Sequence, residues 1–214
     1  MMQSLLIRRL TRYRRILHEL LKKKIYVVSS SELGELVNNS ASQIRQDLHC
    51  FGAFGLQGYG YNVQSLYDQI NNILGLERNY KVIIVGTGNL GQAIANYTHF
   101  YKTGYDIVAL FDVNPKIVGL KINDIEVFEY SVLDDFLSKY KIDIGIITTN
   151  KDNAQAVADK LVKGGVKGIW NFAPADLILP NKIAVENAHL SDSLHILTYQ
   201  IKQSYEEVIQ RESS

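Results

Sequence analysis

Residues 81–95, Lys-Val-Ile-Ile-Val-Gly-Thr-Gly-Asn-Leu-Gly-Gln-Ala-Ile-Ala, decide the fold of this chain. The β-branched run Val82–Val85 predicts a buried strand that ends at Gly86. Gly86, Gly88 and Gly91 have the G-x-G-x-x-G spacing, and a helical pattern follows them. The first glycine allows a tight turn, the second lets a pyrophosphate approach the backbone, and the third lets the helix pack against the strand. The free N–H groups and positive dipole end of that helix form an anion site.

A second apolar run, Asp106-Ile-Val-Ala-Leu-Phe-Asp112, predicts a strand that ends in an acid. A carboxylate at this place takes the adenosine ribose hydroxyls and repels a 2′-phosphate, which favours NAD(H) over NADP(H). A glycine motif by itself also fits a purely structural turn, but this one lies between a strand and a helix and precedes that acid. The stretch therefore predicts a dinucleotide-binding unit.

The C-terminal half continues with alternating strand and helix patterns. Residues 142–149 form an apolar run that ends in Thr148 and Thr149, residues 153–163 form an amphipathic helix, and residues 168–172 form another strand. Such alternation predicts an α/β domain with a doubly wound parallel sheet, in which ligands bind at the carboxyl edge of the strands.

Composition describes an ordinary globular chain with an uneven charge distribution. The chain has 214 residues, 46% hydrophobic and 21% charged, and a net charge of +1. Residues 1–79 carry a net charge of +4 and the remainder −3, which hints at an N-terminal module that binds nucleic acid. We expect no membrane-spanning segment, and the lone Cys50 excludes an internal disulfide or a cysteine-based zinc site. We therefore expect a cytoplasmic protein without a metal.

The basic N-terminal third begins with a helical pattern over residues 4–23. Its apolar stripe alternates with arginines, which either form a solvated face or lie near phosphates or at an interdomain contact: Arg8, Arg9, Arg12, Arg14 and Arg15. Two short helices should follow, because Ser29-x-x-Glu32 and Ser40-x-x-Gln43 both have capping-box spacing and Asn38-Asn39 separates them. This arrangement predicts a helix-turn-helix.

The second of these helices, residues 41–51, would be the recognition helix in the major groove. We expect Ile44 and Leu48 to face the core. The outward side chains, which include arginine and glutamine suited to guanine and adenine edges, would be Ser42, Gln43, Arg45, Gln46 and His49. Gln43 has the alternative role of a helix cap.

Glycines alternate with aromatic residues over residues 51–61, which predicts a β-hairpin with a glycine-rich tip. Next to a helix-turn-helix such a hairpin is a wing, whose glycines allow close approach to sugar and phosphate. At the other end of the chain, a helix over roughly 192–211 has an apolar stripe that the completed sheet leaves without a partner. A second subunit would cover it, so we expect a homodimer.

These features together resemble the Rex family of redox-sensing transcriptional repressors, and the resemblance covers essentially the whole chain. It rests on Ser29–Ser31 with Leu33-Gly34-Glu35-Leu36, Ile44-Arg-Gln-Asp-Leu48 with Phe51-Gly52, Gly58-x-Gly60-Tyr61-x-Val63, Ile73-Leu-Gly-Leu76, Gly86-x-Gly-x-Leu-Gly91, Phe111-Asp112-x-Asn-Pro115, Gly168-Ile-Trp-Asn-Phe-Ala-Pro174 and Val185-Glu-Asn187.

The resemblance implies a winged-helix domain over 1–79, a Rossmann NAD(H)-binding domain over 80–190 and a swapped dimerisation helix over 191–214. It implies a homodimer that holds palindromic operator DNA when NADH is scarce and releases it when NADH binds, while NAD⁺ competes without causing release. The residues that it places at the cofactor are Gly86, Thr87, Gly88, Asn89, Leu90, Gly91, Tyr97, Asp112, Thr148, Thr149, Asn171, Phe172 and Pro174. To the outward residues of the recognition helix it adds Ser30, Ser31, Gln57, Gly58, Tyr59 and Gly60 as DNA contacts.

The chain departs from the family pattern at two places. Many members carry Arg-Lys in the recognition helix and an arginine in the wing, where this chain has Arg45-Gln46 and Gln57, so we expect a changed operator. Members with a described switch pair an arginine, matched here by Arg15, with an aspartate, whose place His189 takes just before Leu190. An Arg–Asp exchange therefore cannot be the switch, and His189 serves as an interface hydrogen-bonding group or adds pH dependence.

Three alternatives remain at the level of sequence. A dehydrogenase would need a substrate domain, and only about 135 residues remain after the DNA-binding part. A thiol switch at Cys50 lacks a flanking lysine or arginine, and we interpret Cys50 as a small buried hydrophobic residue. A CoA- or nucleotide-binding regulator would find no phosphate partner in Asp112.

Overall fold

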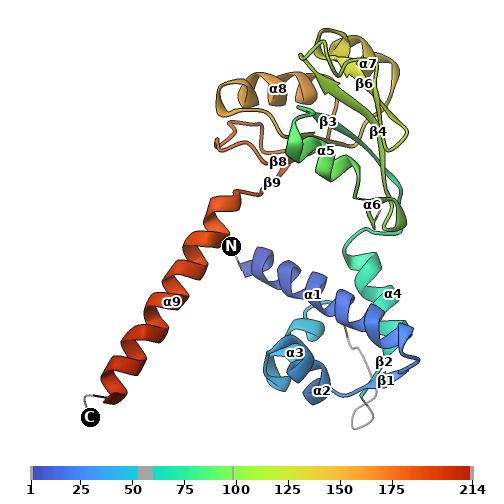
Figure 1. The fold of residues 1–214 in the computed structure, drawn as a ribbon. Helices are drawn as coiled ribbons and strands as arrows, with labels where there is room; N and C mark the ends of the chain where they lie inside the picture. The colour runs from blue at the N-terminus through green and yellow to red at the C-terminus, as the bar shows by residue number, and fades with distance from the viewer. Residues whose placement is uncertain (1, 53–59, 98, 213–214) are drawn as a thin grey trace. The chain divides into compact units, whose positions relative to one another are not determined.

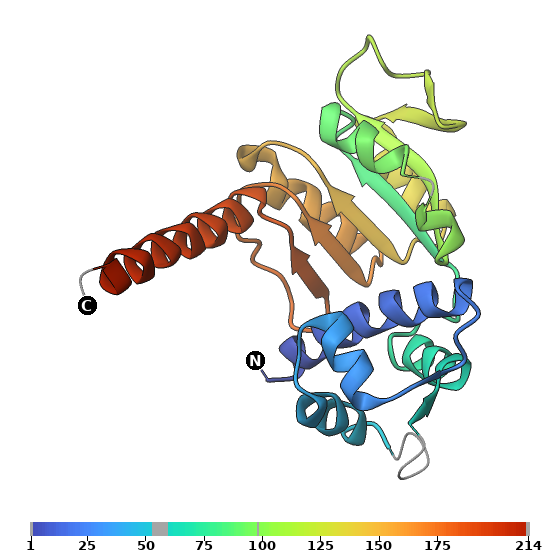
Figure 2. The ribbon, with the colours of Figure 1, turned by 60° about the horizontal axis from the view of Figure 1, so that its bottom comes forward.

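The computed structural model describes residues 2–52, 60–97 and 99–212. Contacts between residues divide the chain into two compact units, Met1–Arg78 and Asn79–Ser214. The first unit contains α1 (Met2–Lys22), β1 (Val27–Val28), α2 (Ser30–Val37), α3 (Ala41–His49), β2 (Tyr61–Asn62) and α4 (Val63–Ile73). These helices appear in blue to cyan in Figures 1 and 2.

The helices of the first unit enclose one apolar core. Apolar residues at helical spacing on α1 pack against α2, α3 and α4, and the largest of them are fully buried: Leu10, Tyr13, Leu17, Leu33, Ile44, Leu48 and Ile70. Between α2 and α3 the chain turns in a left-handed residue, Asn38. A Cβ on Gly34 would lie 2.6 Å from the Asn39 carbonyl oxygen, so only glycine lets the two helices approach so closely.

The caps of α2 and α3 differ. At α2 the Ser29 hydroxyl accepts from the Glu32 N–H and the Glu32 carboxylate accepts from the Ser29 N–H, which completes the predicted capping box. At α3 the Ser40 hydroxyl accepts from the Gln43 N–H, but the Gln43 side chain donates elsewhere. The second box is therefore only half formed.

The predicted hairpin over residues 51–61 differs from what the structure describes. Phe51 and Gly52 lie in a turn after α3, and β2 pairs in antiparallel fashion with β1, which precedes α2. Residues 53–59 lie outside the described part, so the predicted contacts Gln57, Gly58 and Tyr59 lie outside it too. The strand that pairs with β2 therefore lies far away in the sequence, and a local pattern of glycine and aromatic residues does not reveal such a partner.

The second unit is built on one sheet. Within the described residues seven strands form it in the order β5-β6-β4-β3-β7-β8-β9, and every neighbouring pair is parallel except β5 with β6. Its parallel strands have the order of a dinucleotide-binding sheet. The strands are β3 (Tyr80–Val85), β4 (Tyr105–Asp112), β5 (Lys121–Ile122), β6 (Ile125–Glu129), β7 (Ile144–Ile147), β8 (Gly168–Asn171) and β9 (Ala184–Asn187).

Helices cover both faces of this sheet. One face packs against α7 (Leu133–Lys139) and α8 (Lys151–Lys163), and the other against α5 (Asn89–Ala95) and α6 (His99–Lys102) (Figure 1). The doubly wound parallel sheet is thus confirmed. The sequence did not predict β5, β6, α7 or β9, because these elements are short and carry no strong periodicity.

The last element is α9 (Leu190–Glu212), drawn in red in Figure 1. Its apolar side chains are exposed in this chain: Leu190, Leu194, Ile196, Leu197, Tyr199, Ile201 and Tyr205. In the part of the chain that the structure describes, no helix is both long and apolar enough to cross a membrane.

Candidate cofactor site and DNA-binding surface

The three glycines of the motif differ in what a Cβ would meet at each of them. Gly86 has a φ of +98°, and a Cβ on it would lie 2.8 Å from the Thr148 backbone. A Cβ on Gly91 would lie 2.1 Å from the Gly86 carbonyl oxygen. A Cβ on Gly88 would meet nothing within 4 Å. The protein itself therefore requires Gly86 and Gly91, whereas the space at Gly88 is open to a ligand.

Two of the three threonines predicted at the site hold the glycine turn in place. The Thr148 hydroxyl donates to the Gly86 carbonyl oxygen at 2.5 Å, which ties the end of β7 to the turn. Thr87 is fully buried, and its hydroxyl donates to the Phe111 carbonyl oxygen at 3.2 Å. The predicted cofactor residue Thr87 thus directs its side chain into the protein, while the next residues, Gly88 and Asn89, are exposed.

Asp112, at the end of β4, has a fixed orientation. One carboxylate oxygen accepts from the Thr87 N–H at 2.5 Å, and the other accepts from the Asn114 N–H at 2.8 Å. Each oxygen keeps a lone pair for a further donor. Asp112 is partly exposed and lies beside the glycine turn, where a ribose diol can reach it.

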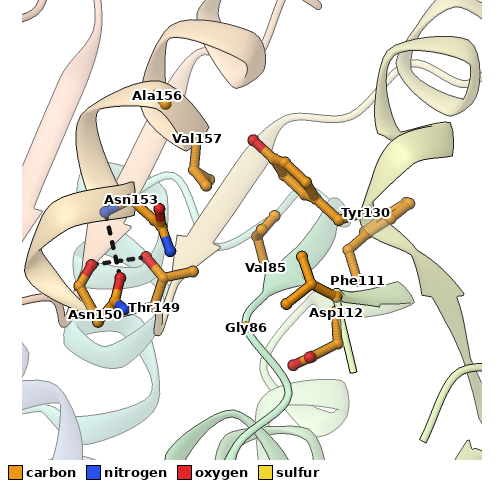
Figure 3. A pocket seen from close by; sticks show the side chains of 11 residues that line it. Val85, Gly86, Phe111, Asp112, Tyr130, Thr149, Asn150, Asn153, Ala156 and Val157 are labelled. Atoms are coloured by element: carbon orange, nitrogen blue, oxygen red, sulfur yellow. Dashed lines mark hydrogen bonds between the residues drawn. The ribbon is translucent and has the colours of Figure 1, made fainter. Parts of the chain in front are cut away.

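A pocket of about 290 Å³ opens next to Asp112 at the carboxyl edge of the sheet. Figure 3 shows Asp112 and Phe111 on one side of it, Thr149, Asn150 and Asn153 on the other, and the Tyr130 ring between them. Its lining is mostly apolar with a polar rim: Val85, Gly86, Phe111, Asp112, Val113, Tyr130, Thr149, Asn150, Asn153, Ala156 and Val157. This composition suits a flat, largely apolar ring with polar edges, such as adenine.

Sequence reasoning missed the wall formed by Tyr130. The Lys160 ammonium lies 4.7 Å from the centre of the Tyr130 ring and 3.0 Å from a carboxylate oxygen of Asp134. Burial raises the pKa of the Tyr130 hydroxyl. No pattern marks Tyr130, because it lies in the short 3₁₀ helix Tyr130–Val132 after the unpredicted strand β6.

Asn171 and Phe172 occupy the carboxyl end of β8. Asn171 is fully buried and its amide bonds only to the protein, so it positions the following segment rather than touching a ligand. The Phe172 ring lies 4.6 Å from the Trp170 ring, which in turn meets Phe100 at 5.8 Å. Phe172 is partly buried and Pro174 is exposed, and both follow the carboxyl end of β8, the edge of the sheet at which the resemblance predicts the cofactor.

Tyr97 lies away from Asp112, and its ring meets the Phe100 ring at 4.8 Å. It follows α5 and lines a second pocket of about 390 Å³ at the amino end of β4, opposite the edge that carries Asp112. The pocket is lined by Ala95, Tyr97, Phe100, Tyr101, Tyr105, Asp106, Ile107, Asn123, Asp124 and Ile125. Within this chain the structure therefore does not bring Tyr97 together with Asp112.

In the first unit, a buried carboxylate fixes the predicted recognition helix. Asp47 on α3 accepts from Arg9 at 2.5 and 2.7 Å, from the Tyr13 hydroxyl at 2.6 Å and from the Gln43 amide at 2.7 Å. Burial disfavours ionisation of Asp47, but the hydrogen bonds from Arg9, Tyr13 and Gln43 outweigh it and hold its pKa below the ordinary value. Burial and the bond to Asp47 raise the pKa of Tyr13.

Most of the predicted outward face of α3 is confirmed as exposed: Ser42, Arg45, Gln46 and His49. Gln43 is the exception, because it is partly buried and its amide binds Asp47. Arg45 donates to the Ser30 hydroxyl at 2.9 Å, which joins the two helices at this face. Sequence reasoning missed the role of Asp47, since an acid in a helix on its own shows no partner.

One further expectation is wrong, and another residue has a structural role beside the predicted one. Cys50 is exposed, so its interpretation as a buried hydrophobic residue is wrong: it lies at the C-terminal cap of α3, past the apolar stripe. Gly60 has a φ of +79°, and a Cβ on it would lie 2.7 Å from the Val28 carbonyl oxygen. The pairing of β1 with β2 therefore requires this glycine even without DNA.

The predicted switch residues lie in different units, and each is described by itself. Arg15 and Leu190 are exposed. The His189 ring is partly buried, with Nδ1 3.9 Å from the Asp192 carboxylate and with Nε2 buried and without a hydrogen-bond partner among the described residues. Among those residues no cluster of histidine, cysteine and acidic side chains is arranged to hold a metal ion.

Comparisons with known proteins agree with this division of the chain. A family model described as a putative DNA-binding protein N-terminus matches residues 5–49, and one described as a CoA binding domain matches residues 77–175. The chain is 54% identical over 198 residues to the redox-sensing transcriptional repressor Rex of Clostridium beijerinckii, covering 92% of this chain and 94% of that protein. It is 58% identical over 192 residues to the Rex protein of Clostridium botulinum, covering 90% and 91%.

Solved structures of the Rex-family repressor RSP are similar over nearly their whole length. RSP in complex with β-NAD⁺ and operator DNA matches with a TM-score of 0.90 and 51% identity, covering 99% of this chain and 98% of that chain. RSP in complex with β-NADH matches with a TM-score of 0.88 and 50% identity, covering 97% of each. The curated relatives are named repressors rather than enzymes, which removes the support for a dehydrogenase. The chain belongs to the Rex family of redox-sensing transcriptional repressors.

Proposed function

We propose that this chain is a transcriptional repressor whose hold on palindromic operator DNA depends on the NADH/NAD⁺ ratio. It binds the operator when NADH is scarce and leaves it when NADH binds, and it acts in the cytoplasm, where that DNA is. Crystal structures of RSP, 50–51% identical, are described as complexes with β-NAD⁺ and operator DNA and with β-NADH. Residues 1–79 form the DNA-binding part, residues 80–190 the cofactor-binding part and residues 191–214 the dimerisation helix.

The observation that carries the cofactor half is the open space at Gly88 beside the oriented Asp112 carboxylate. The pyrophosphate approaches Gly88, the Asp112 carboxylate accepts from the adenosine ribose, and the adenine enters the pocket beside Tyr130. Around this path the residues that contact or shape the site are Gly86, Asn89, Leu90, Gly91, Thr148, Thr149 and Phe172. Tyr97 lies away from Asp112, and its ring meets Phe100, which in turn meets Trp170 beside Phe172. Tyr97 therefore acts at the nicotinamide end of the cofactor rather than at the adenosine end.

The DNA half rests on the exposed face of α3. Arg45 and Gln46 read base edges, and Ser30, Ser31, Ser42 and His49 contact the backbone around them. Asp47 keeps α3 in a fixed orientation for this contact. A two-fold pair of such helices matches a palindromic site.

The exposed stripe of α9 supports a homodimer. Four apolar side chains follow one another at helical spacing on α9, and each is 48–68% exposed in the single chain: Leu194, Leu197, Ile201 and Tyr205. Burying such a stripe against a second copy removes apolar area from water. We propose that the two subunits exchange α9 across the two-fold axis.

Discrimination between the two redox forms rests on charge. Oxidised nicotinamide carries a positive charge, and an apolar surface at Phe172 and Trp170 disfavours that ring relative to the neutral reduced ring. Arg15, His189 and Leu190 then lie where the cofactor state changes the contacts of the dimer, with the histidine in the place of the family aspartate.

Fluorescence of Trp170 tests the cofactor half directly, because its ring contacts Phe172 at the proposed nicotinamide edge. We expect quenching that saturates with NADH at low concentration, weaker binding of NAD⁺ and none of CoA. The Asp112 carboxylate disfavours CoA, which carries a phosphate on the same ribose. Binding of CoA in preference to NADH would contradict the proposal.

A further inference from the structure

The Asn171 side chain joins two segments that the backbone separates by more than ten residues. Its carbonyl oxygen accepts from the Ala173 N–H at 3.0 Å, and its amide nitrogen donates to the Ala175 carbonyl oxygen at 2.8 Å. The same nitrogen donates to the Asn187 side-chain oxygen at 2.9 Å. The Ala173 N–H can bond only to an acceptor, so these contacts also fix which end of the Asn171 amide is oxygen.

The Asn171 side chain itself has no contact with solvent, since Asn171 is fully buried. Both hydrogens of its amide nitrogen are used, and a buried amide that loses a partner is left unsatisfied at considerable cost. The three bonds therefore hold or shift together. A displacement of the turn at Ala173–Ala175 changes the position of the amide and, through it, the position of Asn187.

The two segments have different proposed tasks. Ala173–Ala175 directly follows Phe172 and contains Pro174, which border the nicotinamide edge. Asn187 ends β9, and α9 begins at Leu190, three residues later. The Asn171 amide is thus a direct side-chain link between the proposed cofactor edge of the sheet and the base of the proposed dimerisation helix.

We propose that the hydrogen bond from Asn171 to Asn187 couples cofactor occupancy to the position of α9, and so to release of the operator. Asn187 is a positioning residue that binds neither cofactor nor DNA. This inference rests on the proposed function, because it assigns a residue to the transmission of the NADH signal.

Asn187 can be changed without loss of strand β9, and thermal unfolding reports the stability that the freed Asn171 amide hydrogen costs. Its side chain is exposed, so alanine leaves no cavity. The strand keeps its backbone pairing with β8, and the Ala188 N–H still donates to the Asn171 carbonyl oxygen at 2.8 Å. Asn187→Ala removes the acceptor, whereas Asn187→Asp retains an oxygen at the same place.

The test compares the wild-type protein with Asn187→Ala, Asn187→Asp and a matched control, Asn181→Ala, which changes an exposed asparagine just before β9. NADH affinity is measured by Trp170 quenching, operator affinity by fluorescence anisotropy with and without saturating NADH, and folding by thermal unfolding. The quantity of interest is the ratio of the two operator affinities, which is about 5 to 150 for a typical allosteric pair.

We expect Asn187→Ala to bind NADH and free operator like the wild type but to lower that ratio about fivefold, the size of one lost hydrogen bond. Asn187→Asp should restore the wild-type ratio, and Asn181→Ala should not change it. An unchanged ratio in Asn187→Ala, or a loss of NADH affinity with the ratio intact, would overturn the inference. If NADH does not change the operator affinity of the wild-type protein, the proposed function itself is refuted.

Discussion

Asp47 on α3 and Arg9 on α1 form a bidentate pair, with N–O distances of 2.5 and 2.7 Å. Asp47 is only 2% exposed, whereas Arg9 is 31% exposed, so the acid is buried and the guanidinium covers it. Tyr13 and Gln43 complete the shell of donors around the carboxylate. The pair fixes α3 against α1, and the exposed arginine and glutamine beside it therefore point in a defined direction.

Asp47→Ala should destabilise the N-terminal unit by about 2–4 kcal/mol, because it leaves the buried Tyr13 hydroxyl and the Arg9 guanidinium without their partner. Asp68→Ala is the matched control, since Asp68 also accepts from a glutamine four residues earlier but is exposed. We expect it to cost less than about 0.5 kcal/mol. Hydrogen exchange of the α3 amides measures the loss of stability in both variants. Equal losses would contradict a stabilising role of the pair of Asp47 and Arg9.

The same carboxylate predicts a dependence on pH. Because the folded-state pKa of Asp47 lies below its ordinary value of 3.8, the ionised form is favoured by folding. Its contribution is therefore complete above that value and is lost as pH falls through the lowered pKa. The stability difference between the wild type and Asp47→Asn should shrink in urea unfolding as the pH falls from about 5 to values below 3.8. A difference that stays constant over this range would argue against an ionised Asp47.

Sequence patterns predicted the helices, strands and turns that interactions between neighbouring residues determine. Ser29 and Glu32 specify their helix start through a bond between neighbours, and Gly91 follows a strand at a fixed spacing. Such patterns could not predict partners that only the fold brings together. Asp47 meets Arg9 across 38 residues, and β2 pairs with a strand more than thirty residues earlier. Gln43 illustrates the limit, because its position on the helix was compatible with a cap, a base contact or the bond to Asp47 that it makes.

The glycines provide a contrast between ligand and fold. Gly88→Ala should fold normally, since its Cβ would meet nothing within 4 Å, but should weaken NADH binding by about tenfold or more because the methyl group faces the pyrophosphate path. Gly91→Ala should disrupt the unit, because its Cβ would lie 2.1 Å from the Gly86 carbonyl oxygen. Thermal unfolding and NADH titration of both variants separate the effects. Normal NADH affinity in Gly88→Ala would show that the pyrophosphate does not bind against Gly88.

Asp112→Asn should lower NADH affinity by about tenfold, since it replaces a charged acceptor of the ribose hydroxyls with a neutral one. The same change removes the repulsion of a 2′-phosphate, so the preference for NADH over NADPH should narrow. Competition between the two cofactors, followed by Trp170 fluorescence, measures this preference. A variant that keeps the wild-type preference would show that Asp112 serves only its bonds to Thr87 and Asn114.

The recognition face is tested by Arg45→Ala. Arg45 is exposed on α3, and we expect its loss to weaken operator binding by about 1–3 kcal/mol and to relax specificity at one base pair. NADH affinity should remain unchanged, because the residue lies in the other unit. Operator titrations with single base-pair changes report both effects, and Glu35→Ala on α2 serves as an exposed control. An operator affinity that Arg45→Ala leaves unchanged would show that Arg45 on α3 does not contact the operator.

The most direct test of the account is the affinity of the full-length protein for a fluorescent palindromic operator duplex, measured by anisotropy without cofactor, with NAD⁺ and with NADH at the same saturating concentration. We expect tight operator binding without cofactor and with NAD⁺, and binding weakened by about 5- to 150-fold with NADH, an effect that is reversed when NAD⁺ displaces NADH. Equal operator affinity in NADH and NAD⁺ would contradict a redox-sensing repressor, whatever the cofactor affinities prove to be.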